Sequence, residues 1–335
     1  MRRRHLLALA ASPSIPAIVR PAAAQAGWVP DGPILLVSGY GPGGSTDIGA
    51  RLIADRMAQA LGPDVRIIVE NRPGAAGAIA TEWLKGRPAD GTTIMFQETG
   101  AGAAAPVATI GGTRYDPIRD FTHIGVVSDP PGPFVLNRDF APPSLTPQQI
   151  LQKMKEAPPE SITFASSGFG GVLHLRAEIL SQYLGAKFVH VPYRSGAQMV
   201  TAIMTGEAQF GIAALASAMP FLRDGKIRAV AMVGDKRFPT LPEIPTMAEI
   251  GVPGFENAGW FMLWGPANMP RPAAEALNRA LVITLRDPVV RDRMLLAGHA
   301  PVQGENTLDS TRAYMIRELA EVQRMVDLTG VRLQP

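Results

Sequence analysis

The sequence contains no cysteine. Disulfide bonds, thiolate nucleophiles and cysteine-bound zinc are therefore excluded, and the chain is compatible with any redox compartment. Histidine is scarce too, with five residues in 335, and their spacing matches neither H-E-x-x-H nor a comparable metal-binding pattern. A serine nucleophile elbow of the G-x-S-x-G type is also missing. We therefore expect no metal site and no catalytic residue.

The chain lacks an apolar run of the roughly 20 residues that a membrane-spanning helix needs. Its first 26 residues also lack Asp and Glu. Three arginines at positions 2–4 precede a modest apolar stretch, Leu6 to Val19, and alanines flank Gln25 at a typical cleavage site. This pattern predicts a signal peptide over residues 1–26 and export to the periplasm. The adjacent arginines leave both the Sec route and the twin-arginine route open.

Neither sign of charge is in large excess. The sequence carries 32 basic and 29 acidic residues, a net charge of +3. Four of the basic residues lie in the predicted signal peptide, so 28 basic and 29 acidic residues remain after cleavage, a net charge of −1. A basic footprint for nucleic acid is therefore absent. Hydrophobic residues make up 46% and charged residues 18%, as in a soluble globular protein with one large domain or two ordinary ones.

Strand and helix patterns alternate along the rest of the chain, which indicates an α/β fold with mostly parallel sheets. The expected strands are 34–38, 66–69, 93–97, 122–127, 134–137, 161–165, 187–191, 209–213, 227–233 and 259–265. The expected helices are 48–61, 75–86, 147–156, 173–184, 197–205, 217–224, 272–287 and 307–328. The proline-rich stretches SDPPGPF and FPTLPEIPT bracket a middle block of about a hundred residues. We therefore expect two lobes, with the chain passing from the first to the second and returning.

Glycine is plentiful at the turn between the first expected strand and helix. Gly39, Gly41 and Gly44 have the G-x-G-x-x-G spacing of a dinucleotide-binding loop. Glu70 follows the next strand, where such a fold places a ribose-binding acid. Asp47 opposes this interpretation, because a carboxylate in the first turn of the helix repels a pyrophosphate docked there. Two hypotheses therefore remain for this loop: a protein that binds no cofactor, and an exported nicotinamide-dependent oxidoreductase.

A second glycine-rich turn follows the expected strand 161–165. Ser166, Ser167, Gly168, Gly170 and Gly171 provide hydroxyl groups and an approachable backbone ahead of a helix whose first amides are unpaired. No base lies near the two serines in sequence, so we interpret them as hydrogen-bond donors. Two helix N-termini that face one cleft form a natural site for a small anion.

Several segments of the sequence together resemble one protein family. These segments are GPGGSTD, VENRPGAAG, PADGTTIM, YDPIRDFTHIG, SSGFGGVLHLRAE, VPYRSG, GKIRAVAMVGDKRFPTLPEIPTMAEIGVPGFE and GWFMLWGPANMP. They follow one another along the whole chain after residue 26, and they resemble the extracytoplasmic solute-binding proteins of the tripartite tricarboxylate transporter system, the Bug or TctC family. The resemblance implies a two-lobed, type II-like periplasmic-binding-protein fold. It also implies that the lobes close on a small organic acid, a carboxylate, for delivery to membrane transporter subunits.

Under this resemblance, residues 27–130 with 255–335 form the first lobe, and hinge crossovers join it to a second lobe, 131–254. The family's ligand loops fall on Gly43, Gly44, Ser45, Asp47, Arg72, Ser166, Ser167, Gly168, Gly170, His174 and Tyr193. Gly171 and Arg194 stand where the family often has serine and lysine, and SGYGPGG departs from the family's usual first loop. These departures lie at the edge of the expected pocket and bear on the identity of the ligand.

We expect the site to hold a carboxylate through backbone amides and hydroxyl groups. Arg72 and Arg194 can each form a bidentate pair with a carboxylate, so a site dominated by arginine stays open. A lone histidine at a helix start, such as His174, is more often a packing or capping residue than a ligand. Among the tryptophans, Trp260 is the one expected to reach the cleft. The expected protein is a monomer without enzymatic activity, and a ligand sensor for a membrane signalling partner is the third hypothesis.

Overall fold

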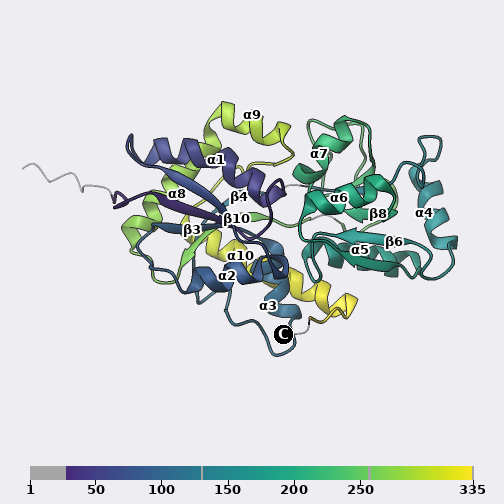
Figure 1. Ribbon diagram of the computed structural model, residues 1–335, viewed down its shortest axis with the longest axis horizontal. Coiled ribbons are helices and arrows are strands. Elements are labelled where there is room, and N and C mark those ends of the chain that lie inside the picture. Colours follow the sequence, from purple (N-terminus) through teal and green to yellow (C-terminus); the bar gives the residue numbers. More distant parts are fainter. Residues whose placement is uncertain (1–27, 130, 256–257, 334–335) are drawn as a thin grey trace, which may run out of the picture.

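The computed structural model describes residues 28–129, 131–255 and 258–333, and the predicted signal peptide lies outside these residues. Two five-stranded sheets lie in two halves of the molecule, which we call lobe 1 and lobe 2 (Figure 1). The first sheet has the order β2-β1-β3-β10-β4, with β1 (Ile34–Ser38), β2 (Ile67–Asn71), β3 (Thr93–Glu98), β4 (Phe121–Ser128) and β10 (Phe261–Pro266). The second has the order β7-β6-β8-β5-β9, with β5 (Gly132–Leu136), β6 (Thr163–Ser166), β7 (Val189–Pro192), β8 (Phe210–Ile212) and β9 (Arg228–Val233).

In each sheet four strands run in one direction and one strand is reversed. In lobe 1, β1 pairs in parallel with β2 and β3, whereas β10 is antiparallel to both β3 and β4. In lobe 2, β6 is parallel to β7 and β8, whereas β5 is antiparallel to β8 and β9. The reversed strand is the one that the chain enters after each crossing between the lobes. The expected two-lobed α/β fold with mostly parallel sheets is confirmed.

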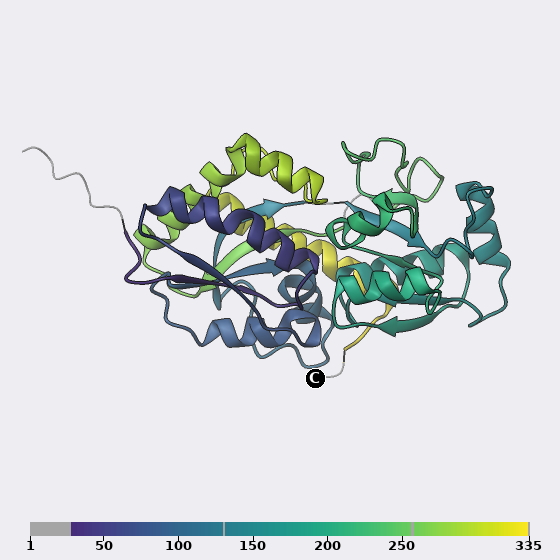
Figure 2. The same ribbon diagram turned by 45° about the horizontal axis from the view of Figure 1, so that its top comes forward.

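Helices cover both faces of each sheet. Lobe 1 contains α1 (Ser45–Leu61), α2 (Ala78–Lys85), α3 (Ala105–Ala108), α8 (Arg271–Arg286), α9 (Pro288–Leu296) and α10 (Leu308–Thr329), and lobe 2 contains α4 (Pro147–Glu156), α5 (Val172–Leu184), α6 (Gly196–Thr205) and α7 (Leu215–Arg223). In Figure 2 the purple α1 and the yellow-green α8 and α9 lie on one side of the first sheet, and the blue α2 lies on the other. Ile53 of α1, Phe96 of β3 and Leu277 of α8 share one apolar core on the first of these sides. Burial of such side chains fixes the strand ends that carry the site.

The C-terminal helix α10 connects the two lobes outside the crossovers. It packs on α5 of lobe 2. Val172 and Leu175 of α5 belong to the same buried cluster as Met315 and Val322 of α10. Lobe 2 is therefore held against lobe 1 by an apolar contact at the start of α5, next to the second glycine-rich turn.

Every expected strand and helix is present, with ends within three residues of the expected ones. Two helical segments were missed: a π-helix, η2 (Gly100–Ala104), that continues into α3, and α9. The segment of η2 and α3 consists mostly of Gly and Ala, so no large apolar side chains repeat at a helical period. No helix in the described ranges is long and apolar enough to cross a bilayer.

Candidate functional site

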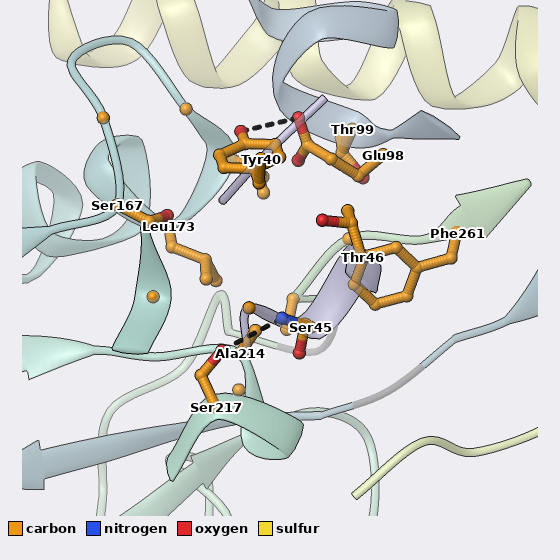
Figure 3. Close-up of a pocket in the computed structure, with 18 of the residues that line it drawn as sticks. Tyr40, Ser45, Thr46, Glu98, Thr99, Ser167, Leu173, Ala214, Ser217 and Phe261 are labelled. Atoms are coloured by element: carbon orange, nitrogen blue, oxygen red, sulfur yellow. Dashed lines mark hydrogen bonds between the residues drawn. The ribbon is translucent and has the colours of Figure 1, made fainter. Parts of the chain in front are cut away.

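A cleft lies between the lobes at the carboxyl ends of parallel strands from both sheets (Figure 3). Lobe 1 contributes Tyr40 and residues 44–46 after β1, residues 98–99 at the end of β3, and residues 259–261 at the start of β10. Lobe 2 contributes residues 167–168 and 171–174 after β6, together with residues 196, 214 and 217. Ligands of open α/β sheets bind in such a crevice, because loops from neighbouring strands converge there.

The N-terminus of α1 opens onto this cleft. Its N-cap, Gly44, has an extended backbone and no capping side chain, and Gly44, Ser45 and Thr46 all line the cleft. The first amides of a helix have no partner within the helix and carry the positive end of its dipole. The buried hydroxyl of Ser45 has no hydrogen-bond partner among the described residues. This helix end therefore offers an anion both amides and a hydroxyl group.

The N-terminus of α5 faces the same cleft from lobe 2. Its N-cap, Gly171, also has no capping side chain, and Gly171, Leu173 and His174 line the cleft. Gly168 in the preceding turn has a φ of +151°, and a Cβ atom there would lie 2.9 Å from the Cβ of Ala76 in lobe 1. Only glycine allows both this backbone conformation and this close approach between the lobes.

A third helix end, that of α7, meets α1 directly. The N-cap of α7 is Ala214, which has no capping side chain, and both Ala214 and Ser217 line the cleft. The hydroxyl oxygen of Ser217 accepts a buried hydrogen bond of 3.1 Å from the Ser45 amide (Figure 3). The N-termini of helices from both lobes therefore converge at one place.

The described lining of the cleft lacks the permanently charged side chains that pair with anions. None of the residues that line it in the described part of the chain is Lys or Arg. Among the described residues that line it, the carboxylate belongs to Glu98, where burial raises the pKa and hydrogen bonds from the Gly100 and Ala101 amides and the Tyr40 hydroxyl only partly offset this effect. The positive potential available to an anionic ligand comes from amide dipoles and hydroxyl groups.

Comparison with known proteins gives the family. Residues 49–330 match the family described as the tripartite tricarboxylate transporter family receptor, TctC. The chain belongs to this family. It is 29% identical over 305 residues to the protein BugT from Bordetella pertussis (strain Tohama I), and the match covers 91% of each chain.

Two solved structures have folds similar to that of this TctC protein. Rpa4515 of R. palustris, solved with adipate, is 27% identical with a TM-score of 0.84 over 91% of this chain and 99% of that chain. MatC (Rpa3494) from Rhodopseudomonas palustris, solved with bound malate, is 26% identical with a TM-score of 0.81 over 89% of this chain and 99% of that chain. The expected family and the solute-binding class are confirmed, and they replace the dinucleotide interpretation of the first glycine-rich loop.

The structure of this TctC protein brings six of the expected site residues together around the cleft: Gly44, Ser45, Ser167, Gly168, Gly171 and His174. Gly43, Ser166 and Gly170 lie in the same two loops but do not line the cleft. Asp47, Arg72, Tyr193 and Arg194 do not line it either. The binding roles of all these residues stay predictions, and the contacts of those that do not line the cleft suggest what they do instead.

Asp47 stabilises the first glycine-rich loop through hydrogen bonds. Its carboxylate accepts hydrogen bonds from the Gly43 amide at 3.0 Å, the Arg51 side chain at 2.9 Å and the Asn71 side chain at 3.0 Å. Burial raises the pKa of Asp47, but these three hydrogen bonds outweigh burial and leave the pKa below its usual range. Asp47 is therefore a fixed anion that shapes the loop in front of α1 rather than a contact on the cleft wall.

Neither of the expected arginines reaches the cleft. The Arg72 guanidinium stacks 3.9 Å from the ring centroid of Trp83 and forms an ion pair of 2.7 Å with Glu70. Glu70, considered above as a ribose-binding acid, is thus engaged with a neighbouring side chain. Arg194 is exposed, and its amide donates to the Gln198 side chain. Neither Arg72 nor Arg194 is among the residues that line the cleft.

No base lies near Ser166 in the sequence, but the fold brings a histidine next to it. The Ser166 hydroxyl oxygen lies 2.7 Å from Nε2 of His190 on the neighbouring strand β7, and it also contacts the backbone of Gly168. Burial and the adjacent His174 lower the pKa of His190 to about 3. Such a histidine is a poorly matched general base near neutral pH. The contacts of Ser166 fix the second glycine-rich turn, while Tyr193 packs with the cluster under α6.

Several residues of the cleft were not predicted from the sequence, above all Tyr40, Glu98, Thr99 and Ser217. One signal was available, because Glu98 and Thr99 lie at the carboxyl end of a buried strand that ends at the crevice. Tyr40 lies inside the glycine-rich loop, and Ser217 lies in the first turn of an expected helix. Trp260 does reach the cleft, as expected.

Proposed function

We propose that this protein captures a small organic carboxylate in the cleft between its lobes and delivers it to a membrane transporter. One observation carries the proposal: uncapped helix N-termini from both lobes, those of α1 and α5, line a single cleft that has no Lys or Arg among its described lining residues. Amides at helix ends bind carboxylates without a formal positive charge. Adipate in Rpa4515 and malate in MatC support a carboxylate as the ligand class.

In this proposal the carboxylate is bound at the first turns of α1 and α5. The amides and hydroxyl group of Ser45 and Thr46 approach it from lobe 1, and Ser167 and residues 171–174 approach it from lobe 2. The lobes consist of residues 27–130 with 255–335 and of residues 131–254, and they close by rotation at the two crossovers. The ligand leaves unchanged, so no enzymatic step is involved.

The site of action is the periplasm, where a monomer of the protein carries the ligand to transporter subunits. The predicted signal peptide and the receptor description of the family support this location and partner. N-terminal sequencing of protein from the periplasmic fraction is expected to begin at or near Gly27. Recovery of protein with Met1 from the cytoplasmic fraction alone would contradict export.

The ligand class is tested by a thermal-shift screen of the purified protein, without the signal peptide, against monocarboxylates, dicarboxylates, tricarboxylates and aromatic acids. A ligand that binds only the folded state raises the unfolding temperature, and the rise grows with the logarithm of the ligand concentration once that exceeds the Kd. At least one small carboxylate is expected to give a shift that increases with its concentration, while the matching uncharged amide gives none. Failure of every acid in the screen would contradict the proposal.

A further inference from the structure

Glu98 places a carboxylate in a cleft that is otherwise suited to anions. It is the last residue of β3, and it lines the cleft together with Tyr40 and Thr99. Figure 3 shows Glu98 and Tyr40 on one side of the cleft, and Ser45 and Ser217 on the opposite side. A ligand whose carboxylate lies at Ser45 therefore extends toward Glu98.

The orientation of the Glu98 side chain is fixed by three neutral donors. Oε2 accepts from the Gly100 amide at 2.8 Å, and Oε1 accepts from the Ala101 amide at 2.9 Å and from the Tyr40 hydroxyl at 2.9 Å. A Cβ atom at residue 100 would lie 2.6 Å from Oε1, so a side chain there would displace the carboxylate from this position. Glu98 thus occupies the amides at the start of η2 and leaves the helix ends of α1 and α5 to the ligand.

The described part of the cleft places no Lys or Arg against this carboxylate. The groups that act on the Glu98 carboxylate are Tyr40 and the two amides, and no Lys or Arg is among the described residues that line the cleft. A carboxylate oxygen can accept more than one hydrogen bond, and among the described residues Oε2 accepts from the Gly100 amide alone. Glu98 therefore retains capacity to accept a hydrogen bond from a ligand.

A second carboxylate on the ligand is poorly matched to this side of the cleft. Two carboxylates that share a site without a cation repel each other, and one of them must take up a proton. A hydroxyl or amino group at the same place instead donates to Glu98, and an ammonium group gains a charge-assisted hydrogen bond. A ligand that leaves a buried charge or a buried donor unpaired binds more weakly, and this difference in affinity gives the specificity.

We propose that Glu98 determines ligand specificity, and that it favours a carboxylate whose far end presents a hydrogen-bond donor, hydroxyl or amino, over a dicarboxylate of the same length. This inference rests on the proposed function, because it places the ligand's first carboxylate at the helix ends of α1 and α5. It concerns the chemical identity of the second polar group of the ligand, which the proposed function does not specify.

Calorimetry on the mature protein tests the inference with matched acids of four, five and six carbons. The probes are the dicarboxylates succinate, glutarate and adipate, and for each length the ω-hydroxy acid and the ω-amino acid. At the length that binds best, the wild type is expected to bind the hydroxy or amino acid at least about tenfold more tightly than the dicarboxylate. A stronger preference for the amino acid indicates an ionised Glu98, and an equal or stronger preference for the hydroxy acid indicates a hydrogen bond without ion pairing.

Glu98→Gln removes the charge at nearly constant shape. It is expected to reduce the preference against the dicarboxylate by about tenfold or more, whereas Glu243→Gln, at an exposed position of lobe 2, leaves it unchanged. Tightest binding of a dicarboxylate by the wild type would overturn the inference even if Glu98→Gln failed to fold. An unchanged preference in folded Glu98→Gln would overturn it as well. If none of the nine acids binds but another carboxylate of the thermal-shift screen does, this inference fails alone, whereas failure of every acid in the screen refutes the proposed function.

Discussion

The amide nitrogen of Ser45 lies 3.1 Å from the hydroxyl oxygen of Ser217, and this hydrogen bond joins lobe 1 to lobe 2 inside the cleft. Both residues belong to the first turns of helices, and neither helix has a capping side chain at its N-cap. The bond therefore holds the lobes together at the place where we propose that the carboxylate binds. A ligand that takes the Ser45 amide competes with Ser217 or enters beside it.

Ser217→Ala is expected to favour the open arrangement of the lobes. A net hydrogen bond contributes about 0.5–1.5 kcal/mol, so its loss lowers the affinity for a ligand that needs closure by about twofold to tenfold. Small-angle scattering is expected to give a larger radius of gyration for ligand-free Ser217→Ala than for the wild type. The control is Ser144→Ala, at an exposed loop position. Equal radii for all three proteins would contradict a role for this bond in closure.

Arg72→Ala and Arg194→Ala are each expected to weaken ligand binding by less than about tenfold, roughly 1.4 kcal/mol. Both guanidinium groups lie away from the cleft wall, and Arg72 is engaged with Trp83 and Glu70. Loss of the cation–π contact is expected to lower the stability of Arg72→Ala by about 0.5–1 kcal/mol. Calorimetry and urea unfolding measure the two effects separately. A hundredfold loss of affinity in either folded variant would assign the ligand carboxylate to arginine.

Asp47→Asn is expected to lower the free energy of unfolding by about 1–3 kcal/mol at pH 7, because three hydrogen bonds to a buried carboxylate are weakened. The folded protein holds the pKa of Asp47 below its unfolded value of about 3.9. The ionised form therefore stabilises the fold above that pH, and this contribution is lost as the pH falls through the folded pKa.

Urea unfolding at pH 7 and at pH 3 checks the Asp47 prediction. The difference between the wild type and Asp47→Asn is expected to shrink at pH 3. Asp55→Asn, at an exposed position of the same helix, is expected to change stability little at either pH. A difference for Asp47→Asn that is the same at both pH values would show that the charge of Asp47 is not what stabilises the loop.

The strands and helices were predictable from sequence because alternation of apolar runs with glycine-rich turns is a local signal. The two turns that carry the helix ends at Gly44 and Gly171 were found in this way. The reversal of β10 within its sheet has no local signal, because strand direction depends on where the chain returns after lobe 2. The contact between Ser45 and Ser217 joins residues 172 positions apart, which no pattern within one segment indicates.

The candidate site was predicted in part for the same physical reason. Backbone donors at a turn are set by glycine and by the helix that follows, so their position can be inferred from the local sequence. The partner of a long side chain is chosen by packing. Arg72 lies in an expected ligand loop, yet the ring of Trp83, on the following helix, receives its guanidinium. The same applies to Glu98, whose direction depends on Tyr40 and on the glycine at position 100.

The central claim is that helix-end amides, and not arginine, hold the ligand, and Gly44→Val tests it most directly. Gly44 has a φ of −77°, which valine can adopt, and a Cβ atom there would lie 3.3 Å from the Gly41 carbonyl oxygen. Because Gly44 lines the cleft next to Ser45 and Thr46, we expect the branched side chain to obstruct the approach to their amides. Calorimetry uses the tightest carboxylate of the screen, with circular dichroism to establish folding and Gly32→Val, at an open and exposed glycine, as the control. We predict that Gly44→Val loses at least about a hundredfold in affinity, roughly 2.7 kcal/mol, while Gly32→Val binds like the wild type. A folded Gly44→Val protein that binds within about tenfold of the wild type would contradict capture by the helix ends.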